Sequence, residues 1–95
     1  MDKLTLDKIV FYSQKDEEAL FTWFRGISAI RKICGEGQKI ILSVNNDISD
    51  NDLREILAVF FRYGADMRQL ADLKNENNEE WFMDSKMYWY ESVFS

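Results

Sequence analysis

Two strands and three helices are predicted by the order of hydrophobic and polar residues, followed by a tail of mixed pattern. The run Ile9–Tyr12 is β-branched and aromatic, which predicts the first strand. Leu4 and Leu6 either extend this strand or lie over the core as a lead-in. The run Lys39–Val44, KIILSV, predicts a second strand that is covered on both faces.

Between these strands, apolar residues recur at spacings of three and four and predict a helix from about Lys15 to Cys34. Ser13, with Asp16 three residues later, has the pattern of an N-terminal cap, and Gly35 follows the last helical residue. A strand, a helix of this length and a second strand predict a right-handed βαβ unit.

The stretch 48–73 predicts two further helices with a break at Gly64. Ser49 is a good cap for the first of them, and Asp66 is a good cap for the second. The apolar stripe of the first helix consists of Leu53, Ile56, Leu57, Phe60 and Phe61, broadened by Val59 and Tyr63. The apolar face of the second consists of Met67, Leu70, Ala71 and Leu73.

The remaining chain is less regular. Residues 74–78 are polar and predict a loop or a frayed helix end, and Asn77 is placed to cap a short helix that reaches Phe82. In residues 87–94 alternation suits a strand, whereas the spacing of Trp89 and Val93 suits a helix, which we favour slightly. The predicted fold is therefore α+β: a single small domain with the order β-α-β-α-α and an ambiguous aromatic tail.

Charge is distributed unevenly over the 95 residues, whose net charge is −5. Residues 1–40 contain seven Lys or Arg and six Asp or Glu, whereas residues 41–95 contain five and eleven, so the two parts carry +1 and −6. An acidic surface repels nucleic acid and attracts basic proteins, so we expect a protein partner and no direct contact with nucleic acid.

Several chemistries are not expected of this chain. It contains no histidine, which removes the commonest general base and metal ligand, so we expect neither an enzyme nor a bound metal or cofactor. The one cysteine, Cys34, is interpreted as a small buried hydrophobe at a helix end in a reducing, cytoplasmic environment. The run IILSV is far shorter than the ~20 residues of a membrane span, and we see no signal peptide.

The candidate binding residues are acidic and aromatic side chains of the C-terminal half, because such aromatics are favoured interface anchors and a carboxylate rim steers a basic partner. These residues are Asp72, Glu76, Glu79, Glu80, Trp81, Asp84, Tyr88, Trp89 and Tyr90. The alternative is that the aromatics belong to the core. A secondary acidic patch consists of Asp47, Asp50, Asp52 and Glu55, which otherwise serve as helix caps and dipole partners.

Other constellations fit poorly. A calcium loop that begins at Asp47 would have Asp52 in place of the required glycine and Ala58 in place of the glutamate. A carboxylate pair for glycoside hydrolysis remains an alternative without an evident cleft. The break at Gly64 has the outline of a helix-turn-helix, an alternative as a regulatory or protein-interaction module, but its second helix offers only Arg68 and Lys74 for phosphate contacts.

The run GADMRQLADLKNENNEEWF at 64–82, followed by YWYESVF at 88–94, resembles the C-terminal part of small bacterial immunity proteins of polymorphic-toxin and contact-dependent inhibition systems. The resemblance covers residues 48–94 and supplies no individual site residues. It implies a small, acidic, cytoplasmic and non-enzymatic protein. Such a protein binds and neutralises one cognate toxin domain, commonly a basic nuclease.

Overall fold

Three strands form an antiparallel sheet in the computed structural model, which describes residues 2–95. They are β1 (Asp2–Asp7), β2 (Ile30–Glu36) and β3 (Lys39–Val44), and their order in the sheet is β1-β3-β2. Because β3 runs antiparallel to both neighbours, β1 and β2 run parallel to each other on its two sides.

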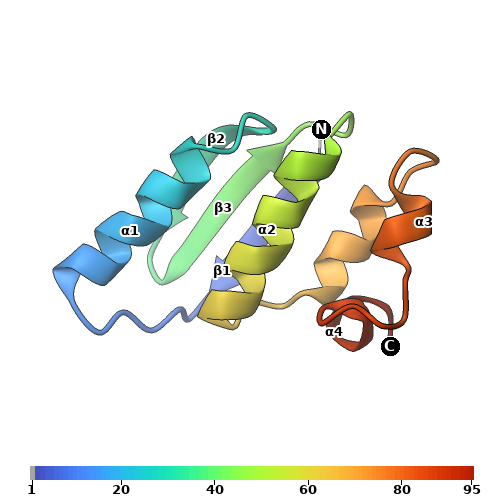
Figure 1. Ribbon diagram of the computed structural model, residues 1–95. Helices are drawn as coiled ribbons and strands as arrows, with labels where there is room; N and C mark the ends of the chain where they lie inside the picture. Colours follow the sequence, from blue (N-terminus) through green and yellow to red (C-terminus); the bar gives the residue numbers. More distant parts are fainter. Residues whose placement is uncertain (1) are drawn as a thin grey trace.

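The helices lie on one face of this sheet and beside it (Figure 1). α1 (Gln14–Arg25) and α2 (Asp50–Tyr63) cover the same face. A 3-10 helix, η1 (Arg68–Leu73), and two short helices, α3 (Glu79–Phe82) and α4 (Tyr90–Phe94), gather beside α2. The α+β class predicted from the sequence is confirmed.

The first strand lies earlier in the chain than the hydrophobic run that predicted it. Ile9–Tyr12 forms no strand but connects β1 to α1, so the prediction of a strand there is wrong. The strand instead uses Leu4 and Leu6, which alternate with polar residues and are buried against the helices. Lys8, with a φ of 56°, turns the chain out of the sheet after β1.

The predicted helix from Lys15 to Cys34 is correct only in its first half. α1 ends at Arg25, and the following segment forms β2, because Ile30 and Ile33 pair with Val44 and Leu42 of β3. The predicted βαβ unit is therefore also wrong, since the strand before α1 and the strand at Lys39–Val44 are antiparallel neighbours. This segment contains β-branched residues at helical spacing, so its sequence fits both a helix and a strand. Pairing with β3 makes it a strand.

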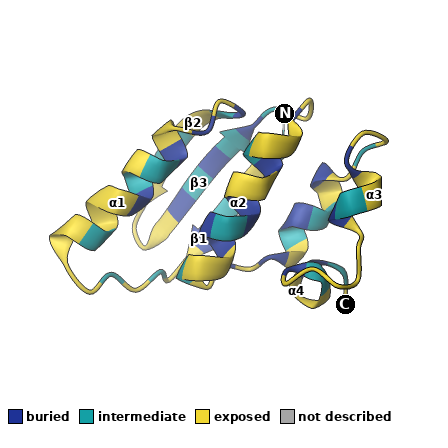
Figure 2. Cartoon of the chain, in the orientation of Figure 1, coloured by how far each residue is buried: buried dark blue, intermediate teal, exposed yellow. Residues whose placement is uncertain are grey.

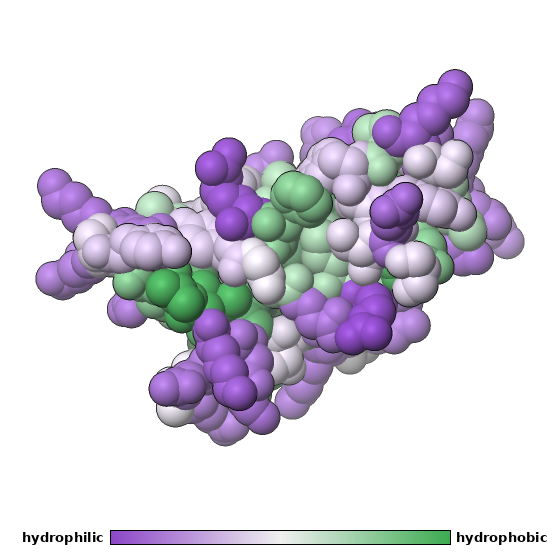
Figure 3. Space-filling model, turned by 90° about the horizontal axis from the view of Figure 1, so that it is seen from below, coloured by the Kyte–Doolittle hydropathy of each residue, from purple (hydrophilic) through white to green (hydrophobic). Residues whose placement is uncertain are grey.

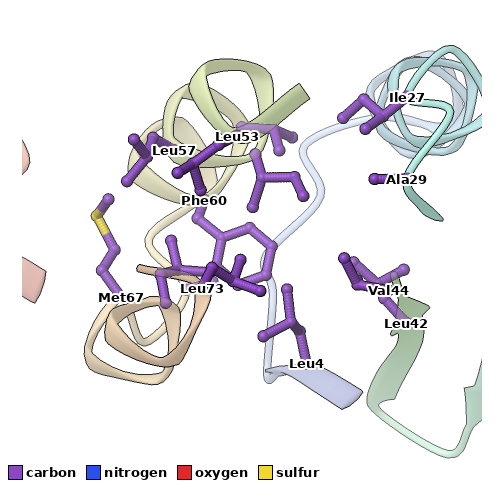
Figure 4. Close-up of a cluster of buried hydrophobic side chains, with 14 of the residues drawn as sticks. Leu4, Ile27, Ala29, Leu42, Val44, Leu53, Leu57, Phe60, Met67 and Leu73 are labelled. Atoms are coloured by element: carbon purple, nitrogen blue, oxygen red, sulfur yellow. The ribbon is translucent and has the colours of Figure 1, made fainter. Parts of the chain in front are cut away.

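α2 forms as predicted. The Ser49 hydroxyl accepts the backbone N–H of Asp52 at 3.2 Å, and Gly64 ends the helix with a φ of 72°. Phe60 points from α2 into the centre of the core, toward Leu4 of β1 and Leu73 of η1 (Figure 4).

The C-terminal part follows the predicted outline with changes in detail. The predicted helix from Asp66 is the 3-10 helix η1, and the predicted cap Asn77 is not a cap, because α3 begins after Asn78. Asn78 is buried, and its side-chain amide donates to the Leu73 carbonyl at 3.0 Å while accepting the Asn75 N–H at 2.9 Å. The tail forms the helix α4, as we favoured.

Burial follows the two layers: the helix-facing residues of β1 and β3 and the inner sides of α2 and η1 are buried, and the outer sides of both long helices are exposed (Figure 2). No helix within residues 2–95 combines the length and apolar character that a bilayer span requires.

Candidate protein-binding surface

An arginine of α2 brings the two predicted acidic clusters together. The Arg54 guanidinium lies over the ring of Trp81 in α3, 4.3 Å from the ring centroid. Cation–π contacts of this kind are favourable and hold the two groups face to face. The first turns of α2 and the acidic segment around α3 therefore belong to one side of the molecule.

The carboxylates of the C-terminal cluster all lie on the surface. The exposed members are Asp72, Glu76, Glu79, Glu80 and Asp84. The closest cation to Glu79 is Lys74, at 3.9 Å, in a solvent-exposed pair. Asp84 accepts the backbone N–H of Lys86 at 3.0 Å, and the cluster as a whole keeps an excess of negative charge.

The predicted aromatic anchors divide between surface and core. Trp89 is only 3% exposed and its indole N–H donates to the Phe82 carbonyl at 2.8 Å, so its assignment to the binding surface is wrong. Trp81 and Tyr90 are half-buried. Tyr88 is 50% exposed and is the one predicted aromatic with a large free face.

In the secondary acidic patch, two carboxylates already have partners inside the fold. Asp52 accepts the backbone N–H of Ala29 at 2.9 Å, and Glu55 accepts the indole N–H of Trp23 at 2.9 Å. These contacts tie α2 to α1 and to the chain before β2. Asp47 and Asp50 are exposed and remain available to a partner.

The apolar stripe predicted for α2 included Phe61, and this assignment to the core is wrong. Phe61 is 50% exposed, and its ring contacts Tyr88 edge to face at a centroid distance of 4.9 Å. Consecutive helical residues point about 100° apart, so Phe60 and Phe61 cannot both face the core. This spacing is the sequence signal that could have identified a surface residue here. A hollow of about 430 Å³ adjoins this pair and is lined by Trp23, Ala58, Phe61, Arg62 and Tyr88.

Two tyrosines have altered acidities. Burial raises the pKa of Tyr88, and the negative charge of Glu55 raises it further. Burial also raises the pKa of Tyr63, whose hydroxyl donates to the Asp16 carboxylate at 3.0 Å. Both hydroxyls are therefore neutral hydrogen-bonding groups at neutral pH.

Other chemical groups are not gathered into a site. Within the described residues, no three His, Cys, Asp or Glu side chains lie close enough together to hold a metal ion. Cys34 is half-buried in β2, paired with Ile41, and not at a helix end as predicted. In η1 the guanidinium of Arg68 lies 3.4 Å from Asp66, which partly neutralises the charge that a nucleic-acid contact would use.

Comparison of the chain with family models, with curated protein sequences and with solved structures found no match.

Proposed function

We propose that this protein is a non-enzymatic immunity protein that binds and neutralises a basic bacterial toxin domain. The observation that carries the proposal is the Arg54–Trp81 contact, which joins the acidic start of α2 to the acidic segment around α3. The exposed Phe61–Tyr88 pair adds apolar area near this surface.

The composition of this surface supports a protein partner. Tyr, Trp, Phe and Arg are enriched where proteins bind each other, and they supply most of the binding energy. The negative charge of residues 41–95, −6 in total, would speed the approach of a basic domain. Inhibition then requires only that the bound protein cover the toxin's active site, whether that toxin is a nuclease or another enzyme.

The proposal includes a cytoplasmic site of action, where an immunity protein meets its toxin. The sequence resemblance to immunity proteins over residues 48–94 supports this location, and the absence of histidine from the chain supports the non-enzymatic role.

Charge reversal tests the surface. The protein encoded immediately upstream of this chain's gene is produced, and its C-terminal domain is assayed for toxicity with and without co-expression of this chain. Binding is then measured for wild type and for a variant with Glu76, Glu79, Glu80 and Asp84 changed to Lys. We expect protection by wild type, and at least a tenfold lower association rate and affinity for the variant.

The matched control changes four exposed acidic residues of the other half, Asp7, Glu17, Glu18 and Glu36, to Lys. This control alters the net charge by the same amount, so a loss of toxin binding that is confined to the first variant locates the binding surface. Equal binding by wild type and both variants would rule out this surface, and absence of protection would rule out the immunity function.

A further inference from the structure

The two edges of the sheet differ in how their backbone groups are satisfied. At the β1 edge, Gln69 of η1 binds both the N–H and the C=O of Thr5, each at 2.8 Å. These groups therefore point away from β3, which makes Thr5–Ile41 a non-hydrogen-bonded pair of the antiparallel ladder.

The alternation of antiparallel pairing then fixes the other edge. Ile41 must direct its backbone groups toward β2 and its partner Cys34, so Ile33 and Gly35 direct theirs away from β3. Within residues 2–95 no group outside the sheet bonds to the backbone of Ile33 or Gly35. The β2 edge is thus open at Ile33 and Gly35, whereas the middle of the β1 edge is occupied at Thr5.

The two helices above the sheet are wide enough to cover one more strand beside β2. Packed helices lie about 10 Å apart, and neighbouring strands about 4.8 Å apart, so two helices cover roughly four strands. This sheet has three. Phe21 of α1 and Ile33 of β2 pack against the core but remain half-exposed, as residues at an uncompleted edge would.

A groove of about 590 Å³ begins at this edge and runs between the β1–α1 connection, α1 and the β2–β3 turn. Its apolar lining is Ile9, Val10, Phe11, Phe21 and Ile40. Viewed from below, the molecule has its strongest hydrophobic area on this side, to the left of the view (Figure 3). Val10 is 63% exposed and contributes to this hydrophobic area.

Gly35 connects the edge to the groove. It lies opposite Ile40, whose side chain faces the helices, so a side chain at Gly35 would face the groove. A Cβ added there would meet no atom within 4 Å. A large side chain on an adjoining strand can occupy the space that an edge glycine leaves.

The charge around the edge is positive. Arg31 and Lys32 are exposed on β2, Lys39 begins β3 beside Glu36, and Lys8 lines the groove. These four cations outnumber the three exposed acids of the same region, Glu17, Glu36 and Asp7, the last of which is the β1 partner of Lys39. An acidic occupant is therefore favoured.

We propose that the β2 edge is a strand-addition site for an acidic, extended segment of another protein. The segment pairs with the backbone of Ile33 and Gly35, places a large apolar side chain opposite Gly35 in the groove, and places a carboxylate near Lys32 on the open face of the sheet. Backbone pairing supplies affinity and the groove supplies side-chain selectivity. This site is separate from the acidic surface and does not rest on the proposed function.

A second copy of the chain does not fit this edge. Pairing β2 with β2 of another molecule would bring two α1 helices over adjacent strands, closer than the about 10 Å that packed helices require. The bulge at Arg31 and the lysines protect the edge against such pairing. The stretch from Lys32 to Glu36 keeps a regular register with β3.

The test uses a random 12-residue peptide library displayed on its encoding mRNA and selected on the full chain. Gly35→Val serves as the counter-selection target, because valine favours strands and meets open space there, so the fold is retained. Cys34→Val is the matched control on the opposite face. We expect the selection to enrich acidic peptides with alternating large apolar residues. These peptides should bind Gly35→Val at least tenfold more weakly than wild type, and should bind Cys34→Val as tightly as wild type.

One enriched peptide is then titrated into ¹⁵N-labelled protein. We expect amide exchange at Ile33 and Gly35 to slow at least tenfold, Lys32→Glu to weaken binding about fivefold, and N-methylation of the peptide's pairing amides to abolish it. Failure to enrich any peptide over the Gly35→Val counter-target would overturn the proposal. Binding that tolerates N-methylation, or that shifts Phe61 and Tyr88 in place of β2, would overturn it as well.

Discussion

The side chain of Gln69 pairs with Thr5 as a neighbouring strand would, accepting the Thr5 N–H and donating to the Thr5 carbonyl at 2.8 Å each. Its amide N–H also reaches the Asp66 carbonyl at 2.7 Å. One side chain therefore joins η1 to the sheet and satisfies the outward-facing backbone groups in the middle of the β1 edge, where unpaired groups promote aggregation.

Replacing Gln69 with Leu should lower the free energy of unfolding by about 1–3 kcal/mol, because both backbone groups of Thr5 lose their partner. Urea denaturation measures this loss, and light scattering should show more self-association through the opened β1 edge. Gln38→Leu is the matched control, since Gln38 is exposed in the β2–β3 turn. Equal stability of the two variants would mean that the Gln69 contacts contribute nothing.

Two tryptophans of the C-terminal part should respond differently to the same change. The indole N–H of Trp89 bonds the Phe82 carbonyl, whereas that of Trp81 is buried without a partner among the described residues. Trp89→Phe should therefore destabilise the fold by about 1–3 kcal/mol more than Trp81→Phe, which removes an unsatisfied donor. Thermal or urea denaturation of both variants provides the comparison, and the reverse order would contradict these hydrogen bonds.

Gly64 and Gly26 both follow a helix but differ in backbone conformation. Gly64 has a φ of 72°, whereas Gly26 has a φ of −81°. Gly64→Ala should cost about 1–2 kcal/mol, because the left-handed conformation strains an L-residue. Gly26→Ala should be neutral or slightly stabilising, since a Cβ there makes only an ordinary 3.4 Å contact with the Trp23 carbonyl. Urea denaturation of both variants measures these changes in the free energy of unfolding.

The hydroxyl of Tyr63 should make stability sensitive to alkaline pH. Its folded-state pKa is raised above the ordinary 10.0, by burial first and by Asp16 second, so the folded chain holds this proton more tightly than the unfolded chain. Its contribution is therefore complete below about pH 10 and is lost as the pH rises through the folded-state pKa.

Unfolding free energies of wild type and Tyr63→Phe, compared from neutral to strongly alkaline pH, test this dependence. The difference between them should shrink above about pH 10. Tyr12→Phe, at a residue 89% exposed, should show no such change. A constant difference for Tyr63→Phe would contradict the raised pKa.

Asp52 and Asp50 lie in the same first turn of α2 but should differ in importance. Asp52 accepts the Ala29 N–H at 2.9 Å, whereas Asp50 is exposed. Asp52→Ala should cost about 1–3 kcal/mol, and Asp50→Ala only the few tenths of a kcal/mol expected from the helix dipole. For partner binding we expect the opposite: loss of Asp50 should matter more, because its carboxylate is free. Stability and binding measured on the same two variants separate these roles.

How far the sequence predicted this fold depended on whether the controlling contacts are local. The cap at Ser49, the stop at Gly64 and the amphipathic stripe of α2 act within a few residues, and these predictions were correct except for Phe61, which is exposed. The tail helix followed from local spacing as well. The exposed carboxylates of the C-terminal segment were also predicted correctly, since charged groups seldom enter a core.

The strands show where local pattern was insufficient. Residues 30–34 satisfied a helical spacing but form part of β2, and Ile9–Tyr12 had the stronger strand propensity but β1 formed at Asp2–Asp7. A strand gains its stability from cross-strand neighbours that lie far away in sequence, and β3 paired with both of its neighbours through alternating apolar residues.

The sequence by itself determined the α+β class, the position of α2 and the acidic character of the C-terminal half. Only the tertiary structure decided which side chains stay on the surface: Trp89 enters the core, Phe61 remains outside, and Asp52 is used internally. It also decided that η1 bonds to Thr5 at one sheet edge, whereas at the other edge no group among the described residues bonds to Ile33 or Gly35 from outside the sheet. The physical reason is that burial and edge pairing depend on which segments meet in space, which composition and periodicity do not encode.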